Sequence, residues 1–299
     1  MKNLVSNIAT KRLRSLILAL ALLASLGAAS CDSEGNPIPL LLMVDGHRGN
    51  MAGYLYVLNP ANASYAVVAA TRDAQGTHYG LSSIAFGPDG KLYGVTGAGG
   101  FGWEAENLRD PMLFEVNPVS GLLTAIGETV DSSMEPRYMS SIVFGPDGTL
   151  YGLVSVNDPT EAAGDLATID PETGEVTVIG GDAGEWANGM VWDEEGERLL
   201  LAPQTSADGA MGEGLDGSLV SLNTTTGAPT TVVTLDGPLN SGGTEGVGVV
   251  AMAYVGDTLY ALLTNWDGQQ QVLATIDVAT GDVEIIGKLP PRVKGLAGR

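Results

Sequence analysis

The sequence predicts an all-β protein, a β-propeller of five four-stranded antiparallel blades. One observation is a five-fold motif: Leu, two variable residues, an aliphatic residue and then Asp or Asn. Its copies begin at Leu55, Leu113, Leu166, Leu219 and Leu273. The leucines are 58, 53, 53 and 54 residues apart, and a repeat of that length is typical of a propeller or another repeat array. Each copy is followed by a short turn and a second apolar run, which predicts a β-hairpin.

A second motif supplies the other half of each unit. Residues 83–94 and 141–152 both read Ser-Ile-x-Phe-Gly-Pro-Asp-Gly-x-Leu-Tyr-Gly, and degenerate copies span 189–196 and 251–260. Pro-Asp-Gly is typical of a tight turn because proline presets φ and glycine supplies a positive φ. Apolar residues on both sides of the turn predict two strands. Two hairpins in each unit make four antiparallel strands, which is a propeller blade.

The two ends of the chain complement each other. The first unit begins near Leu40 with the strand-like run 40–44 but lacks a Ser-Ile-x-Phe strand. The run 293–297, which follows the last unit, resembles that missing strand. We therefore expect the C-terminal strand to complete the N-terminal blade and close the ring, which removes exposed sheet edges. A sixth blade would need strands in 95–112 or 201–218, which have the character of loops.

Residues 1–30 have the features of a signal peptide. Four basic residues (Lys2, Lys11, Arg12 and Arg14) precede the apolar run 16–26, which is shorter than the ~20 residues that a membrane span needs. The segment resembles a bacterial lipoprotein signal, which implies that Cys31 is lipidated and becomes the mature N-terminus. Ala28 stands where such signals usually have Leu. The alternative is an ordinary signal peptide with a cysteine near its cleavage site.

The lone cysteine supports the lipoprotein interpretation, because a single Cys31 cannot form an internal disulfide. Residues 31–38 then form the lipidated cysteine and a polar tether, and residues 39–299 form the propeller domain. The expected location is the bacterial cell envelope, in the periplasm or on the outer surface. The lipid anchor would be the protein's single contact with the membrane.

The composition is strongly acidic. The chain has 14 Lys and Arg against 35 Asp and Glu, a net charge of −21. Removal of the signal peptide leaves 10 basic residues and a net charge of about −25. This charge disfavours nucleic acid and anionic lipids as partners. We predict no cofactor; Ca²⁺, which binds oxygen ligands, stays open, although the Asp-x-Asp-x-Asp-Gly loop is absent.

The topology of a blade indicates where a site would lie. The turns after strands one and three lie at one end of a four-stranded blade, and the connections after strands two and four lie at the other. The first set is short and uniform here, whereas the second is long and differs between blades, as binding loops do. No catalytic residue stands out, because there is no G-x-S-x-G motif and no histidine spacing typical of zinc sites. The ligand-binding candidates in these connections are His47, His78, Trp103, Glu104, Glu185, Trp186, Trp266 and Asp267.

The repeats resemble those of bacterial secreted β-propellers of the quinoprotein-like, WD40-like and NHL-like kinds. Quinoprotein blades usually carry a docking tryptophan after a turn such as 171–174. None of the five units has it, so the resemblance implies no quinone cofactor. Six-bladed lactonases of the gluconolactonase type share turns similar to Gly-Pro-Asp-Gly and hold a central metal. Their ligand positions find no match here, and the fold alone assigns no activity.

The sequence therefore predicts an envelope-anchored, monomeric binding module for a protein, peptide or glycan. Trp103, Trp186 and Trp266 are the candidate aromatic anchors. The alternative is a metal-dependent hydrolase or lactonase acting in the central channel. A third interpretation is an assembly scaffold without a ligand.

Overall fold

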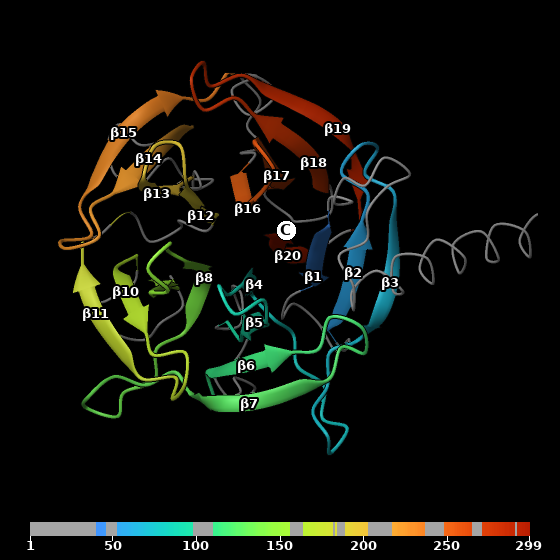
Figure 1. Cartoon of the computed structure of the whole chain (residues 1–299), viewed down its shortest axis with the longest axis vertical. Helices are drawn as coiled ribbons and strands as arrows, with labels where there is room; N and C mark the ends of the chain where they lie inside the picture. Colours follow the sequence, from blue (N-terminus) through green and yellow to red (C-terminus); the bar gives the residue numbers. More distant parts are fainter. Residues whose placement is uncertain are drawn as a thin grey trace, which may run out of the picture.

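The chain forms a ring of five β-sheets, as Figure 1 shows. The computed structural model describes residues 40–45, 53–97, 110–155, 164–181, 183, 189–202, 217–236, 248–264, 271–290 and 292–299. All regular structure in these ranges is strand, in five four-stranded antiparallel sheets. The prediction of a five-bladed all-β propeller is confirmed. None of the described segments forms a helix that could span a membrane.

Each sheet is one blade, numbered here in chain order. Blade 1 contains β1 (Leu41–Asp45), β2 (Tyr54–Leu58), β3 (Tyr65–Ala70) and β20 (Val293–Gly298). Blade 2 contains β4 (Ser83–Phe86), β5 (Leu92–Val95), β6 (Met112–Val116) and β7 (Leu123–Glu128). Blade 3 contains β8 (Met139–Phe144), β9 (Leu150–Val154), β10 (Leu166–Ile169) and β11 (Val176–Gly180). Blade 4 contains β12 (Met190–Asp193), β13 (Arg198–Leu201), β14 (Ser218–Leu222) and β15 (Pro229–Thr234). Blade 5 contains β16 (Gly248–Val255), β17 (Thr258–Thr264), β18 (Gln271–Ile276) and β19 (Val283–Leu289).

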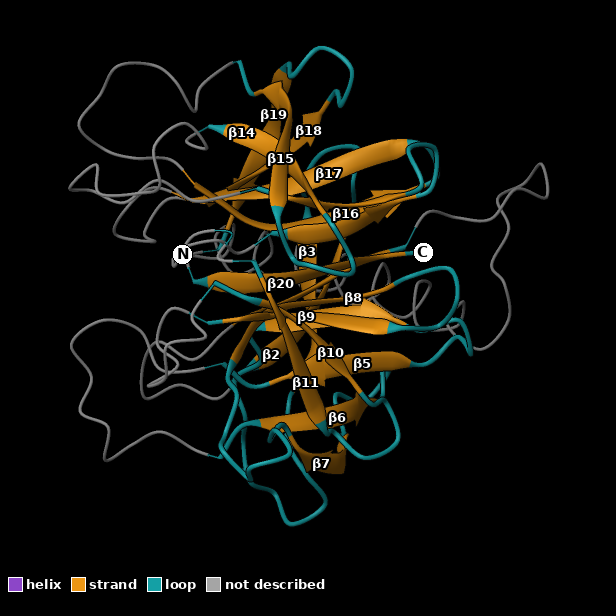
Figure 2. Ribbon diagram, turned by 90° about the vertical axis from the view of Figure 1, so that its left-hand side faces the viewer, coloured by secondary structure: helices purple, strands orange, loops and turns teal. Residues whose placement is uncertain are grey.

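The ring is closed by the C-terminal strand, as expected. β20 pairs with β1, with Leu41 opposite Gly298 and Leu42 opposite Ala297. Leu40 and Arg299 extend the ladder by exchanging backbone hydrogen bonds of 3.1 and 2.9 Å. The innermost strands β20, β4, β8, β12 and β16 contact one another in a closed cycle around the central channel. Figure 2 shows β8, β16 and β20 passing through the middle of the molecule.

The hydrophobic core is divided among the five interfaces between blades. Leu41 and Met43 of β1 belong to the cluster shared with blade 5. Leu42 and Val44, on the other face of the same strand, belong to the cluster shared with blade 2. Because both faces of a blade are buried, the strand is an unbroken apolar run and does not alternate with polar residues. The other three interfaces each hold one such cluster.

The Asp or Asn that ends the five-fold motif shapes a six-residue turn between the third and fourth strands of every blade. In blade 3, Asp170 Oδ1 accepts hydrogen bonds from the backbone N–H groups of Glu172 (2.8 Å) and Thr173 (3.2 Å). The N–H of Gly174, which has φ +84°, donates to the Asp170 carbonyl at 2.8 Å. These groups form an Asx turn followed by a left-handed residue, so the repeated carboxylate or amide has a structural role.

The same turn forms the contact with the preceding blade. A Cβ on Gly174 would lie 2.8 Å from the carbonyl oxygen of Glu128, at the end of β7, and one on Gly121 would lie 2.6 Å from that of Ala70, at the end of β3. Blade 1 has Ala63 at the equivalent position, buried and with φ +55°. Figure 1 shows the outermost strands following one another around the rim. Short parallel bridges such as Arg72 to Leu122 join them.

Neighbouring innermost strands are also joined by the serine of the Ser-Ile-x-Phe motif. Ser83 Oγ accepts a hydrogen bond of 3.0 Å from the Ile142 N–H of the next blade, and Ser141 Oγ accepts one of 3.2 Å from the Met190 N–H. An innermost strand has no partner on its channel side, so these backbone donors would otherwise lack a protein acceptor. The serine is therefore part of the ring's structure.

We expect Gly174→Ala to destabilise the protein more than Gly76→Ala. Both glycines have φ +84°, so either alanine costs about 1 kcal/mol in left-handed backbone. A Cβ on Gly76 meets nothing within 4 Å, whereas one on Gly174 pushes blades 2 and 3 apart, for a total of about 3 kcal/mol. Urea unfolding of both variants measures the difference. Equal losses would show that the turn needs its glycine for φ alone.

Candidate functional site

The two ends of the ring differ in how much their connecting segments vary. The turn end holds the turns after the first and third strands of each blade, and those after the third strand are six residues long in all five blades. The variable end holds the other connections, which range from 3 residues (290–292) to 16 residues (96–111 and 202–217). The turns after the first strands of blades 2 to 5 are two to five residues long. The turn end therefore has short turns throughout, whereas the connections of the variable end diverge.

The candidate residues of the variable end fall largely outside the described residues. His78 is described: it lies in the connection between β3 and β4, is exposed and forms an isolated antiparallel bridge with Arg72. A ligand at the variable end could therefore reach its imidazole. The remaining predicted site residues, which lie outside the described ranges, are Cys31, His47, Trp103, Glu104, Glu185, Trp186, Trp266 and Asp267.

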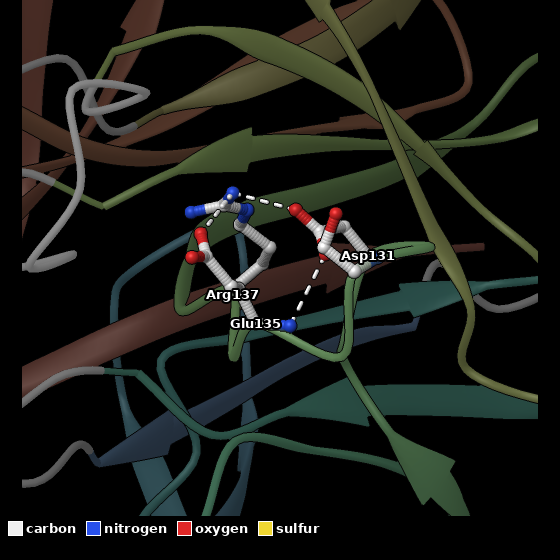
Figure 3. A network of polar contacts seen from close by, with 4 residues as sticks. Asp131, Glu135 and Arg137 are labelled. Atoms are coloured by element: carbon white, nitrogen blue, oxygen red, sulfur yellow. Dashed lines mark hydrogen bonds and ion pairs between the residues drawn. The ribbon is translucent and has the colours of Figure 1, made fainter.

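The connection between β7 and β8 is fixed by partly buried ion pairs around Arg137. Figure 3 shows the Arg137 guanidinium directed at Asp131 and Glu135. Arg137 Nη2 lies 2.6 Å from Asp131 Oδ2 and 3.1 Å from Glu135 Oε2, and the arginine side chain is 8% exposed. Hydrogen bonds from the Glu135 backbone N–H and from Arg137 lower the pKa of Asp131. The carboxylate therefore remains charged over the neutral range and holds both the arginine and the loop.

The connection between β3 and β4 is built in the same way. In each loop a threonine hydroxyl donates a hydrogen bond to the backbone carbonyl eight residues later. In each loop an aspartate Oδ1 also accepts hydrogen bonds from two backbone N–H groups. The threonines are Thr71 and Thr129, and the aspartates are Asp73 and Asp131. These groups fix the base of each loop and leave its tip exposed, as at Met134, which is 73% exposed. The tips can therefore vary without loss of the fold.

A cavity of about 1410 Å³ lies at the centre of the ring, at its turn end. Its walls are the last residues of the five innermost strands and the turns that follow those in blades 2 to 5, and on one side it extends over β18 and β19 of blade 5. The ligand-binding residues predicted from the sequence lie at the opposite end of the ring, and only the alternative hydrolase was expected to act in the central channel.

Four aromatic side chains line the cavity from equivalent positions of four blades. These are Phe86, Phe144, Trp192 and Tyr254, all half-buried, which we call the aromatic collar. Each collar residue is the fourth residue of a Ser-Ile-x-Phe motif or of its degenerate copy. That recurrence is visible in the sequence, where it predicts a strand and does not by itself indicate a cavity.

The collar residues also pack against the preceding blade. The Phe144 ring lies 5.0 Å from that of Tyr93, and the Trp192 ring stacks at 14° on that of Tyr151, with 6.3 Å between centroids. These contacts fix the orientation of each ring at the edge of the cavity. Burial of aromatic surface and ring–ring contacts of this kind both stabilise the interfaces.

Blade 1 completes the collar in a different way. It has Gly298 at the collar position, where a Cβ would lie within 2 Å of the Tyr254 carbonyl oxygen. The next residue, Arg299, places its guanidinium 5.8 Å from the centre of the Phe86 ring. A cation therefore already occupies one aromatic face of the collar.

A buried carboxylate joins blades 4 and 5 beside the collar. Asp193, 4% exposed, accepts a hydrogen bond of 2.8 Å from Arg198 Nε and one of 3.4 Å from the Tyr254 hydroxyl. Burial of the Tyr254 side chain, as the larger cause, and the negative charge of Asp193, as the smaller, raise the pKa of Tyr254 to about 12. The Tyr254 hydroxyl therefore remains protonated at neutral pH and serves as a hydrogen-bond donor.

Carboxylates outnumber cations among the described residues that line the cavity. The two cations described there are Arg198, which is paired with Asp193, and Arg299, which lies over Phe86. The seven lining carboxylates are Asp193, Glu194, Glu195, Asp257, Asp277, Asp282 and Glu284. A concave surface with this imbalance concentrates a negative potential and attracts cations.

Within the described ranges, no three or more His, Cys, Asp or Glu side chains converge as metal ligands would. The cavity carboxylates are distributed over blades 4 and 5. The prediction about Ca²⁺ therefore remains a prediction.

Comparison with known proteins identifies no family. No protein-family model and no curated protein match the sequence. Solved structures that match include a periplasmic gluconolactonase from Pseudomonas aeruginosa (16% identity, TM-score 0.47), which covers 85% of this chain and 83% of that one. A nidogen–laminin complex matches with 13% identity and a TM-score of 0.49, over 87% of this chain and 98% of that one. TolB from Acinetobacter baumannii matches with 11% identity and a TM-score of 0.46, over 87% of this chain and 66% of that one. At these identities and TM-scores the similarity carries no information about activity.

We expect Asp193 and Arg198 to be energetically coupled. Arg198→Gln leaves a buried carboxylate without its cation; because Arg198 is 34% exposed, solvent limits the loss to about 2 kcal/mol. The double variant D193N/R198Q removes the charge as well and should recover at least half of that loss. Urea unfolding of D193N, R198Q and the double variant completes a double-mutant cycle, which measures the coupling energy. Additive losses would contradict the coupling.

We expect Asp131→Asn to destabilise the protein at pH 7 and to have a shrinking effect in acid. The folded pKa of Asp131 lies below its ordinary value of 3.8. The charged form therefore contributes its full stability above that value and loses it as the pH falls through the folded pKa. Thermal melts of both proteins between pH 7 and pH 3 measure the difference. A difference that stays constant over this range would show that the carboxylate charge is irrelevant.

Proposed function

We propose that this chain is an exported, lipid-anchored binding module that engages a protein, peptide or glycan through the variable end of the ring. The observation that carries the proposal is the contrast between the two ends. The turns after every third strand have one length, whereas the connections at the variable end range from 3 to 16 residues. A uniform scaffold that carries divergent loops on one face is the usual arrangement for recognition.

The described loops support this proposal because their bases are fixed and their tips are exposed. Thr71 and Asp73 brace one connection, and Thr129, Asp131 and Arg137 brace the next. Loops held in this way lose little conformational entropy when a partner binds.

Within this proposal the loop tryptophans Trp103, Trp186 and Trp266 are the aromatic anchors. Aromatic residues combine a large apolar area with few rotatable bonds, which favours them as binding hot spots. His47, His78 and Glu185 provide polar contacts. Residues 1–30 are the signal peptide, Cys31 carries the lipid, and residues 31–38 tether the propeller domain, residues 39–299, to the membrane.

The test is affinity capture from detergent-solubilised envelopes of the source cells, with identification of the captured partner. We expect the triple variant W103A/W186A/W266A to lose the partner that wild type captures, by at least about tenfold at equal bait concentration. The matched control Y65A/V67A/I285A removes three exposed large side chains from the outer strands β3 and β19. It should capture the partner as wild type does.

Both variants must melt as wild type does before the capture is interpreted. Loss of the partner in both variants would contradict a role for the variable end. If no specific partner is captured, the alternative of a metal-dependent hydrolase in the central channel is tested next, by metal analysis of the purified protein and by melting with and without a chelator.

A further inference from the structure

We propose a second binding site, at the turn end of the ring, where the cavity takes an organic cation: a guanidinium or ammonium group. This site does not depend on the proposed function, because it lies at the opposite end of the blades and shares no residue with the variable end. Its elements are the aromatic collar, Arg299 and the carboxylates of blades 4 and 5.

The collar provides the surfaces on which such a cation packs. Four aromatic residues at equivalent positions leave part of each ring at the cavity wall, since each is half-buried. Contacts with the preceding blade, such as Trp192 on Tyr151, hold the rings in place. An organic cation gains both apolar contact and electrostatic attraction from an aromatic face.

The chain itself shows a cation in this position. The Arg299 guanidinium lies over the Phe86 ring, 5.8 Å from its centre. The opposite side of the cavity, beside Trp192 and Tyr254, has no such cation among the described residues, because Arg198 is paired with Asp193. We therefore place the ligand on the side of blades 4 and 5.

The charges on that side of the cavity determine whether the ligand is a cation or an anion. Glu194 and Glu195 follow Trp192 and Asp193 directly, and Asp257 lies in the corresponding turn of blade 5; all three are exposed and line the cavity. A negative potential in a concave site favours a cation and excludes an anion. The aromatic surface favours an organic cation, because a metal ion needs several converging oxygen ligands and the carboxylates among the described residues do not converge in this way.

The experiment uses a protein in which Trp192 is the single tryptophan, W103F/W186F/W266F. It is titrated with spermine and with an acetylated tetra-arginine amide, each carrying about four positive charges at neutral pH, and calorimetry gives the affinity. We expect a saturable change in Trp192 fluorescence whose midpoint matches the calorimetric Kd. Tighter binding of the peptide would indicate a protein source of the cation, and tighter binding of spermine a small-molecule source.

Two matched pairs of variants locate the site. E194Q/E195Q/D257N should weaken binding about tenfold, whereas E128Q/E172Q/E175Q, which removes the same charge from exposed positions outside the cavity, should change it less than about twofold. Arg299→Gln frees the Phe86 face and removes a like charge, so it should strengthen binding about threefold. Lys288→Gln, which changes an exposed cation outside the cavity, should leave binding unchanged.

Three results would overturn the proposal. Equal weakening by the two triple carboxylate variants would mean general attraction to an acidic protein. Calorimetric binding without a change in Trp192 fluorescence would place the ligand elsewhere. Absence of saturable binding to either probe would remove the site. None of these outcomes bears on capture at the variable end, so each proposal can fail by itself.

Discussion

Burial of both faces of every blade is the constraint on which this structure depends. A blade has no core of its own: Leu41 and Met43 pack against blade 5, while Leu42 and Val44 pack against blade 2. An open ring would expose two such faces and a free sheet edge, so the five blades are stable as a closed set. The pairing of β20 with β1 therefore stabilises all five interfaces and not blade 1 alone.

Close packing of the blades also explains why the fold could be predicted from the sequence. Each turn after a third strand touches the end of the preceding blade, so it needs a left-handed residue with little or no side chain, and Gly121, Gly174, Gly227 and Gly281 fulfil this need. The Asx turn before it fixes the preceding Asp or Asn. These requirements recur in every blade because the interface recurs, which is why the period, the blade count and the closure were all predictable.

The same reasoning explains which parts of the candidate site could not be predicted. Phe86, Phe144, Trp192 and Tyr254 recur for a packing reason, so their pattern predicted a strand and gave no sign that their rings also reach the channel. The fraction of each aromatic ring that is exposed at the channel depends on the radius of the closed ring of blades. That radius cannot be read from any single repeat. The pairing of Asp193 with Arg198 was equally hidden, since Asp193 belongs to a degenerate copy of the turn motif and Arg198 lies just after it. His78, in contrast, was predicted to lie in an exposed connection, and it does.

The two ends of the ring are therefore under different physical constraints, and this separates the two proposed sites. Residues of the collar stabilise an interface and line a cavity with the same ring, so a change in ligand preference there also changes the free energy of unfolding. The loop tips beyond Thr71 and Thr129 are exposed and contribute little to the core, so they can change with small effects on stability. Recognition of varied partners suits the variable end, whereas a chemically simple ligand, such as an organic cation, suits a site whose shape is fixed by the packing of the blades.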